Sequence, residues 1–149
     1  MRLIYKKGDI FEKLVEGIIY VQSCNGQNIW GAGISLKFRK NFPDAYQIYQ
    51  KKKNRVGDGY IVNHGKYLIG CLITSEFYGK LKDPPKKILV QTYTALQNMF
   101  QTISEKEITI YSPKINSGYF ATPWDATEKV IIRACENIDK KIGWVVWEF

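Results

Sequence analysis

The sequence predicts an α/β fold in which helices cover both faces of a mixed sheet. Short runs rich in β-branched and aromatic residues alternate along the chain with longer stretches whose apolar residues recur every three or four positions. No internal repeat, low-complexity segment or long Pro/Gly/Ser linker divides the 149 residues, a length that suits one domain. Strands that alternate with helices favour a sheet with crossover connections.

The first half of the chain contains four predicted strands and two predicted helices. The run Ile18-Ile19-Tyr20-Val21 is typical of a strand. Pro43 ends one helix and suits the first turn of the next, on which Ala45, Ile48 and Tyr49 share a face. In order, we expect a strand at Arg2–Tyr5, a strand at Gly17–Ser23, helices at Ile34–Arg39 and Pro43–Lys53, and strands at Tyr60–Val62 and Tyr67–Thr74.

The second half contains two longer helices, each followed by a strand. The clearest helix has apolar residues at a spacing of three and four from Ile88 to Ile103. On the last helix, the inward side is predicted to hold Val130, Ile131, Ala134 and Cys135. In order, we expect a helix at Lys86–Ile103, a strand at Ile108–Ser112, a helix at Asp125–Ile138 and a strand at Trp144–Phe149.

Composition excludes several classes of protein. The three cysteines, Cys24, Cys71 and Cys135, have no C-x-x-C spacing, and the single histidine, His64, cannot complete a common zinc set, so no metal site is expected. The longest apolar run, Tyr67–Ile73, is far shorter than the roughly 20 residues that cross a bilayer. With no signal-peptide pattern at the start, we expect a soluble, cytoplasmic or otherwise intracellular protein with no membrane partner.

The positive charge of the chain is concentrated in one stretch. The formal net charge is +8, and the residues from Lys37 to Arg55 include seven basic side chains opposed only by Asp44. Such a cluster favours an anionic partner, for example a nucleotide. The alternative is a solvated helix surface that keeps the protein soluble.

Two loops, each between a predicted strand and a helix, have the composition of a phosphate-binding site. The first loop is Ser23–Gly33, in which Gly31 and Gly33 allow close approach of a ligand to the start of a helix. The second loop is Lys114–Pro123, with small and polar residues around Gly118. Since ligands bind beyond the carboxyl ends of parallel strands, these loops predict a two-sided clamp for a diphosphate.

Five motifs, taken in order, resemble those of a macro domain. They are G-D-I-F from Gly8, V-Q-S-C-N from Val21, W-G-A-G-I from Trp30, F-R-K-N-F-P-D-A-Y from Phe38 and S-P-K-I-N-S-G-Y-F-A-T-P-W from Ser112. The chain looks most like the branch that contains the yeast-type ADP-ribose-1″-phosphate phosphatase and the terminal ADP-ribose protein glycohydrolase. The resemblance covers nearly the whole chain and implies one macro domain over residues 1–149, a three-layer α/β/α sandwich.

The resemblance also implies a binding site for ADP-ribose or ADP-ribose 1″-phosphate, with no cofactor. Asp9 and Ile10 would contact the adenine, and Asn25 would face the distal ribose. The two sides of the diphosphate clamp would come from the two loops. The full set of implied ligand contacts is Asp9, Ile10, Ser23, Asn25, Trp30, Gly31, Ala32, Gly33, Ile34, Asn116, Ser117, Gly118, Tyr119 and Phe120.

This chain lacks several of the catalytic residues of that branch. Ser75 stands where the glycohydrolases have a nucleophilic lysine, Phe120 stands where they have an aspartate, and Gln22 stands where the phosphatases have a histidine. A glutamine cannot act as a general acid or base. The candidates for positioning a phosphate or a water molecule are Asn25, Asn28, Ser75 and Asn116.

Three functions follow, in decreasing order of support. The first is a phosphatase that removes the terminal phosphate of ADP-ribose 1″-phosphate, or a hydrolase of another ADP-ribosyl linkage. The second is a non-catalytic reader of ADP-ribose or of ADP-ribosylated macromolecules, which the residues at positions 22, 75 and 120 favour. The third is a nucleic-acid-binding module that uses the basic stretch, and a nucleic acid is the least supported partner.

Overall fold

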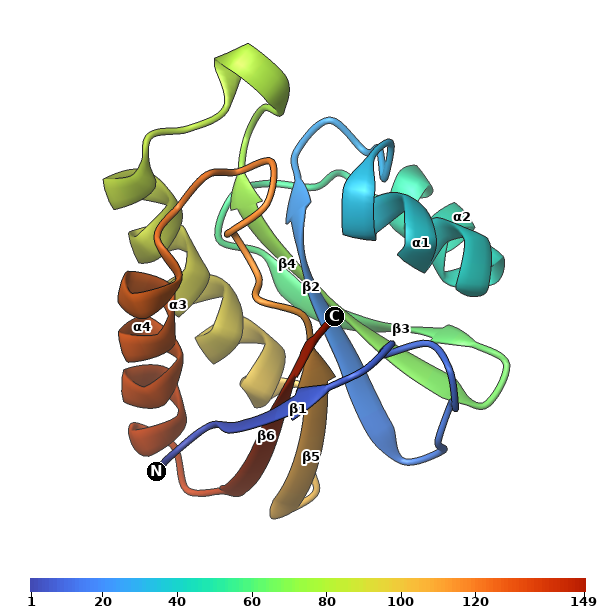
Figure 1. Ribbon diagram of the computed structural model, residues 1–149, viewed down its shortest axis with the longest axis vertical. Coiled ribbons are helices and arrows are strands. Elements are labelled where there is room, and N and C mark those ends of the chain that lie inside the picture. The colour runs from blue at the N-terminus through green and yellow to red at the C-terminus, as the bar shows by residue number, and fades with distance from the viewer.

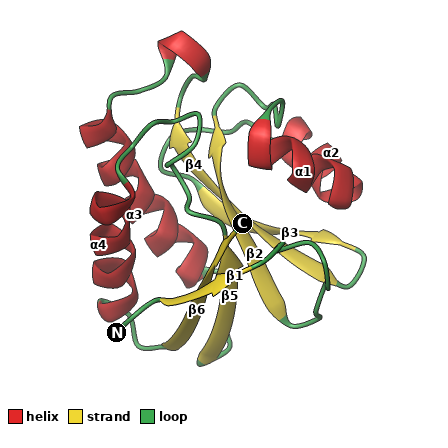
Figure 2. Ribbon diagram, viewed as in Figure 1, coloured by secondary structure: helices red, strands yellow, loops and turns green.

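A six-stranded mixed sheet forms the centre of the computed structural model, which describes residues 1–149 (Figure 2). Its spatial order is β1-β6-β5-β2-β4-β3, and every neighbouring pair is parallel except β3 and β4. The strands are β1 (Ile4–Lys7), β2 (Ile18–Asn25), β3 (Gly59–His64), β4 (Tyr67–Ser75), β5 (Glu107–Ser112) and β6 (Lys141–Glu148).

Helices cover both faces of this sheet, which confirms the predicted three layers (Figure 1). One face carries α1 (Gly33–Asn41) and α2 (Pro43–Lys51), and the other carries α3 (Pro85–Gln101) and α4 (Trp124–Glu136). A short 3₁₀ helix, η1 (Gly79–Leu81), follows β4 at the top of the view in Figure 1.

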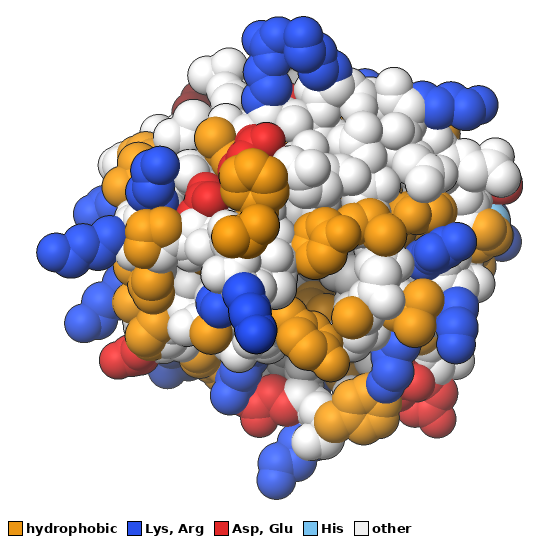
Figure 3. All heavy atoms as spheres, turned by 90° about the horizontal axis from the view of Figure 1, so that it is seen from above, with side chains coloured by type: hydrophobic (Ala, Val, Ile, Leu, Met, Phe, Trp, Pro, Cys, Tyr) orange, Lys and Arg blue, Asp and Glu red, His pale blue; other side chains and the backbone are white.

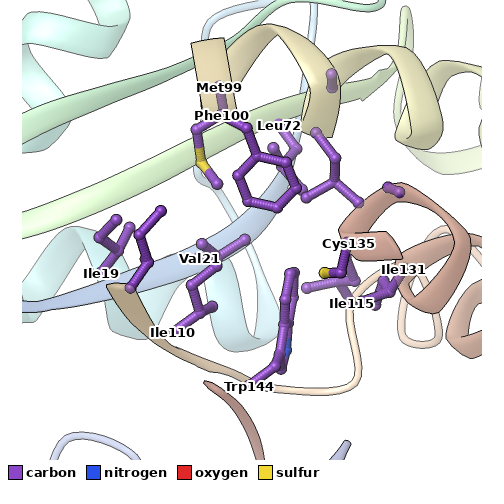
Figure 4. Close-up of a cluster of buried hydrophobic side chains, with 14 of the residues drawn as sticks. Ile19, Val21, Leu72, Met99, Phe100, Ile110, Ile115, Ile131, Cys135 and Trp144 are labelled. Atoms are coloured by element: carbon purple, nitrogen blue, oxygen red, sulfur yellow. The ribbon is translucent and has the colours of Figure 1, made fainter. Parts of the chain in front are cut away.

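Side chains that alternate along β2 divide the core in two. Ile19 and Val21 point into the cluster shared with α3 and α4, where Phe100 and Trp144 are also buried (Figure 4). Ile18 and Tyr20 point into the aromatic cluster beneath α1 and α2. Because successive residues of a strand face opposite sides, a strand buried on both sides is apolar at every position, as this part of β2 is.

All ten predicted strands and helices are present, with ends that differ from the prediction by up to three residues. The largest difference is at β6, which begins at Lys141 because Lys141 and Ile142 pair with Glu107 and Ile108. The prediction was wrong about Ile48, which is 42% exposed. Tyr46 is buried on α2 in its place, since its ring packs against Trp30 at a centroid distance of 5.2 Å.

The chain turns to opposite faces of the sheet after β2 and after β5. These strands are parallel neighbours, with Ile18 opposite Thr109, so the loops that follow them leave the same edge side by side. The loop after β2 leads to α1 on one face, and the loop after β5 leads to α4 on the other. A point where the connections diverge in this way leaves a crevice at the carboxyl ends of the strands.

Candidate functional site

A cavity of about 690 Å³ opens in this crevice. Figure 3 shows this end of the molecule, with hydrophobic side chains around its hollowed middle and basic side chains around its outline. Most of the predicted contacts line the cavity, namely Ile10, Ser23, Asn25, Gly31, Ala32, Gly33, Ile34, Asn116, Ser117, Gly118, Tyr119 and Phe120.

The first loop is ordered by the side chain of Asn25, at the end of β2. Its Oδ1 accepts a hydrogen bond from the amide of Gln27 at 3.0 Å, and its Nδ2 donates to the carbonyl of Ile29 at 2.8 Å. The hydroxyl of Tyr49 donates to the carbonyl of Asn25 at 2.7 Å. Burial raises the pKa of Tyr49 above its ordinary value, so this hydroxyl keeps its proton.

The second loop is anchored by Asn116, which is 2% exposed and has a positive φ of 66°. Its Oδ1 accepts from the hydroxyl of Thr74 at 2.8 Å, and its Nδ2 donates to the hydroxyl oxygen of Thr92 on α3 at 2.9 Å. Its amide nitrogen donates to Ser23 Oγ at 3.1 Å. The hydrogen bonds of Asn116 therefore join the second loop to β2, β4 and α3.

Two rows of backbone N–H groups, in residues that line the cavity, have no hydrogen-bond acceptor in the protein. One row belongs to residues 31–35, at the start of α1, where no side chain caps the helix. The other belongs to residues 118–120 in the second loop. Unpaired N–H groups at a helix start and in a tight loop attract anions. The two loops thus present donors to one cavity from two sides.

Four of the predicted residues do not line the cavity. Asn28 donates from its Nδ2 to the carbonyls of Gln50 and Lys52 at 3.2 and 3.1 Å. Trp30 is completely buried and stacks on Tyr49 at a centroid distance of 5.0 Å. Ser75 is also buried, and its hydroxyl donates to the carbonyl of Phe77 at 2.7 Å and accepts from the amide of Asp83 at 2.9 Å. Asp9, beside Ile10, accepts a hydrogen bond from the amide of Phe11 at 2.9 Å. Trp30 and Ser75 support the walls of the site without touching its interior.

No side chain in the lining is a carboxylate, an imidazole or a thiol. Its one side chain that is charged at neutral pH is Lys114, whose Nζ lies 3.1 Å from Oε1 of Glu148. His64 does not line the cavity and lies 3.5 Å from a carboxylate oxygen of Asp44. No group of three or more His, Cys, Asp or Glu residues is placed to hold a metal ion. The arrangement is suited to binding an anion through neutral donors.

Eleven lining residues were not among the predicted contacts. Five of them are Gln22, Tyr78, Gly79, Trp147 and Phe149. Each lies at or near the carboxyl end of β2, β4 or β6. Strand direction was the signal that could have identified them, because the carboxyl ends of parallel strands share an edge.

The basic stretch Lys37–Arg55 lies on α1, α2 and the segment that follows them. The Nζ of Lys37 lies 4.4 Å from the ring centroid of Phe149, which lines the cavity. Arg39 and Lys52 lie over the rings of Tyr46 and Tyr60, which do not line it. Only one end of the basic stretch therefore reaches the cavity. None of the helices is long and apolar enough to cross a membrane.

Comparison with known proteins gives one consistent family. Residues 21–131 match the model of the macro domain. An ADP-ribose 1″-phosphate phosphatase of Candida albicans is 32% identical and aligns with 85% of this chain and 90% of its own length. One from Chaetomium globosum is 27% identical over 88% of this chain and 83% of its own length. The macrodomain of Mycobacterium tuberculosis DarG superposes with a TM-score of 0.77 over 99% of this chain and 98% of its own, at 17% identity.

Proposed function

The chain belongs to the macro-domain family, and from this premise we propose that it binds ADP-ribose derivatives in the cavity and hydrolyses ADP-ribose 1″-phosphate to ADP-ribose and inorganic phosphate. We also propose that residues 1–149 form one macro domain. The matched segment ends before β6 and begins after β1, yet both strands belong to the same sheet. The proposed reaction is the one that the name of the Candida albicans relative describes.

The observation that carries the proposal is that each of the two loops lining the cavity contains a row of N–H groups without an acceptor. A diphosphate bound between residues 31–35 and 118–120 would receive hydrogen bonds from both loops. The nucleoside would then lie toward Ile10 and Phe149, and the distal ribose toward Asn25 and Tyr78. Neutral backbone donors bind phosphate oxygens without a fixed positive charge.

The same donors account for the chemistry that the proposal requires. In the hydrolysis, a water oxygen attacks the phosphorus, the bond between phosphorus and the ribose oxygen breaks, and the leaving oxygen takes a proton. Those of the N–H groups that do not contact the diphosphate would stabilise the charge on the phosphoryl oxygens in the transition state. Asn25 and Asn116 would act by holding the two loops, since their amides are hydrogen-bonded within the protein. Ser75 would act by fixing the segment that contains Tyr78.

Phosphorus NMR of ADP-ribose 1″-phosphate mixed with the purified protein tests the proposal. We expect an inorganic phosphate signal to grow over hours and the diphosphate signals to remain. A Gly118→Val variant should release no phosphate, because its side chain would enter the cavity. Phosphate release at the same rate by the variant would contradict the assignment of the site.

A second candidate function is a reader of ADP-ribose or of ADP-ribosylated macromolecules. It is favoured by the lining, whose side chains offer no carboxylate or imidazole to act as a general base. In the same NMR experiment, a reader would broaden the diphosphate signals of ADP-ribose 1″-phosphate and produce no inorganic phosphate.

A further inference from the structure

Gln22, in the middle of the cavity floor, has a buried carboxamide without a partner. The residue is 1% exposed, and neither its Nε2 nor its Oε1 makes a hydrogen bond in the protein. Burying an amide without a partner costs free energy, so most such groups in native proteins are paired. Gln22 lines the cavity, where a ligand can supply the missing partners once the carboxamide turns toward it.

A second unpaired donor lies on the same floor. The indole Nε1 of Trp147 is buried and has no acceptor, and Trp147 also lines the cavity. Both residues stand on the sheet face that carries α1. Tyr20, two residues before Gln22, packs edge-on against Tyr111, and Tyr111 packs edge-on against Trp147.

The strand register puts these two residues on one face of the sheet. Tyr20 is opposite Tyr111, and Tyr111 is opposite Val145. Gln22 and Trp147 each follow a residue of this row by two positions, past the end of the β2–β5 pairing, and so share its face of the sheet. Both line the cavity, as does Pro113, which follows β5.

We propose that Gln22 determines ligand specificity by pairing its carboxamide with the adenine edge of the ligand, with the Trp147 indole as a second donor to the same nucleoside. This inference rests on the proposed function, because it takes the ligand to be an ADP-ribose derivative. Adenine presents an acceptor and a donor side by side, which is the complement of a carboxamide. Gln22 and Trp147 line the cavity together with Ile10 and Phe149, toward which the proposed function places the nucleoside. The broad terminal torsion of glutamine lets the amide turn toward the ligand.

Calorimetric titration of wild type and Gln22→Met with ADP-ribose and with ADP tests the inference. Methionine is similar in size to glutamine and has no strong hydrogen-bonding group. We expect the variant to bind both ligands about tenfold more weakly. Its melting temperature without ligand should be equal to or above that of wild type, because a buried unpaired amide has been removed.

Gln97→Met is the matched control. The Nε2 of Gln97 donates to the carbonyl of Ala134 at 3.1 Å, away from the cavity. This variant should lose thermal stability and keep wild-type affinity for both ligands. Trp147→Phe, which keeps an aromatic ring and removes only the N–H, gives a second test at the other proposed contact and should also weaken both ligands.

The outcomes separate the inference from the function on which it rests. If wild type binds no ADP-ribose, the proposed function fails. If wild type binds ADP-ribose and both Gln22→Met and Trp147→Phe bind it equally well, only the inference is overturned. A loss of affinity for ADP-ribose without a loss for ADP would place the contact on the distal ribose and overturn the nucleoside assignment. A fall in the melting temperature of Gln22→Met without ligand would show that Gln22 has a structural role instead.

Discussion

The ring of Tyr119 lies directly against Gly33, so the second loop reaches across the cavity to the first residue of α1. A Cβ added at Gly33 would come within 2.8 Å of Cε2 of Tyr119. Gly33 also has a φ of +57°, a backbone conformation that residues other than glycine rarely adopt. The contact links the two loops that contain the rows of N–H groups.

Gly33→Ala should therefore affect both stability and binding. We expect a loss of about 1 kcal/mol in the free energy of unfolding from the backbone strain. Displacement of Tyr119 should in addition weaken ADP-ribose binding by about tenfold. Urea denaturation and calorimetry measure the two effects. Gly65→Ala is the control, since Gly65 has a φ of +55° and open space around its Cβ position. Equal affinities in the two variants would contradict the role of the Tyr119 contact.

Gly118→Val should abolish binding without unfolding the protein. Gly118 lines the cavity, and a Cβ there meets nothing within 4 Å, so a valine side chain fits the fold. The proposed clamp places the diphosphate against the backbone of Gly118, where the added side chain would obstruct it. We expect affinity for ADP-ribose to fall at least about a hundredfold by calorimetry. Gly143→Val, at an exposed position of β6 with equally open space, should bind as wild type does. Retained affinity in Gly118→Val would exclude the clamp.

Asn116→Ala should destabilise the fold. The change leaves the hydroxyls of Thr74 and Thr92 without their amide partner, and it places alanine at a positive φ. We expect a loss of about 2–4 kcal/mol in the free energy of unfolding, measured by urea denaturation. Asn137→Ala removes a single exposed hydrogen bond to Tyr93 and should change stability by less than about 0.5 kcal/mol. If Asn116→Ala lost phosphatase activity at wild-type stability, a direct catalytic role for Asn116 would replace the positioning role.

High pH should destabilise the protein through its buried thiols and tyrosines. Burial raises the pKa of Cys135, on α4, from 9.0 to about 12. Between these values the unfolded chain has lost a proton that the folded chain keeps, so the free energy of unfolding falls as pH rises above about 9. The contribution of Cys135 is at most about 1.4 kcal/mol per pH unit.

Cys135→Ala isolates this contribution. The variant should be less stable at neutral pH, because it loses buried volume, but its stability should decline less steeply above about pH 9. Urea denaturation from about pH 8 to about pH 11 gives both slopes. Parallel slopes for the two proteins would contradict the raised pKa of Cys135.

Much of the fold and the backbone of the site could be predicted from local sequence. Alternation and helical spacing identify each element, and the two loops stand out because glycine and small polar residues follow strands. Side-chain placement within the site was harder to predict. Trp30 lies in a loop of candidate contacts, yet its ring is covered by Tyr46 and Tyr49 from α2. The polar role of Gln22 depends on the absence of partners in neighbouring strands, which only tertiary structure defines.

The hydrogen bond between Ser23 and Asn116 joins residues 93 positions apart in the sequence. Four of the five strand pairs are parallel and joined only through long-range connections, and β3–β4 alone is a local hairpin. The two walls of the cavity therefore meet only when the central strands have assembled, which is a late event for contacts of such high sequence separation. A ligand that bridges both loops should act mainly on the unfolding rate and extend the lifetime of the native state, while it leaves the folding rate nearly unchanged.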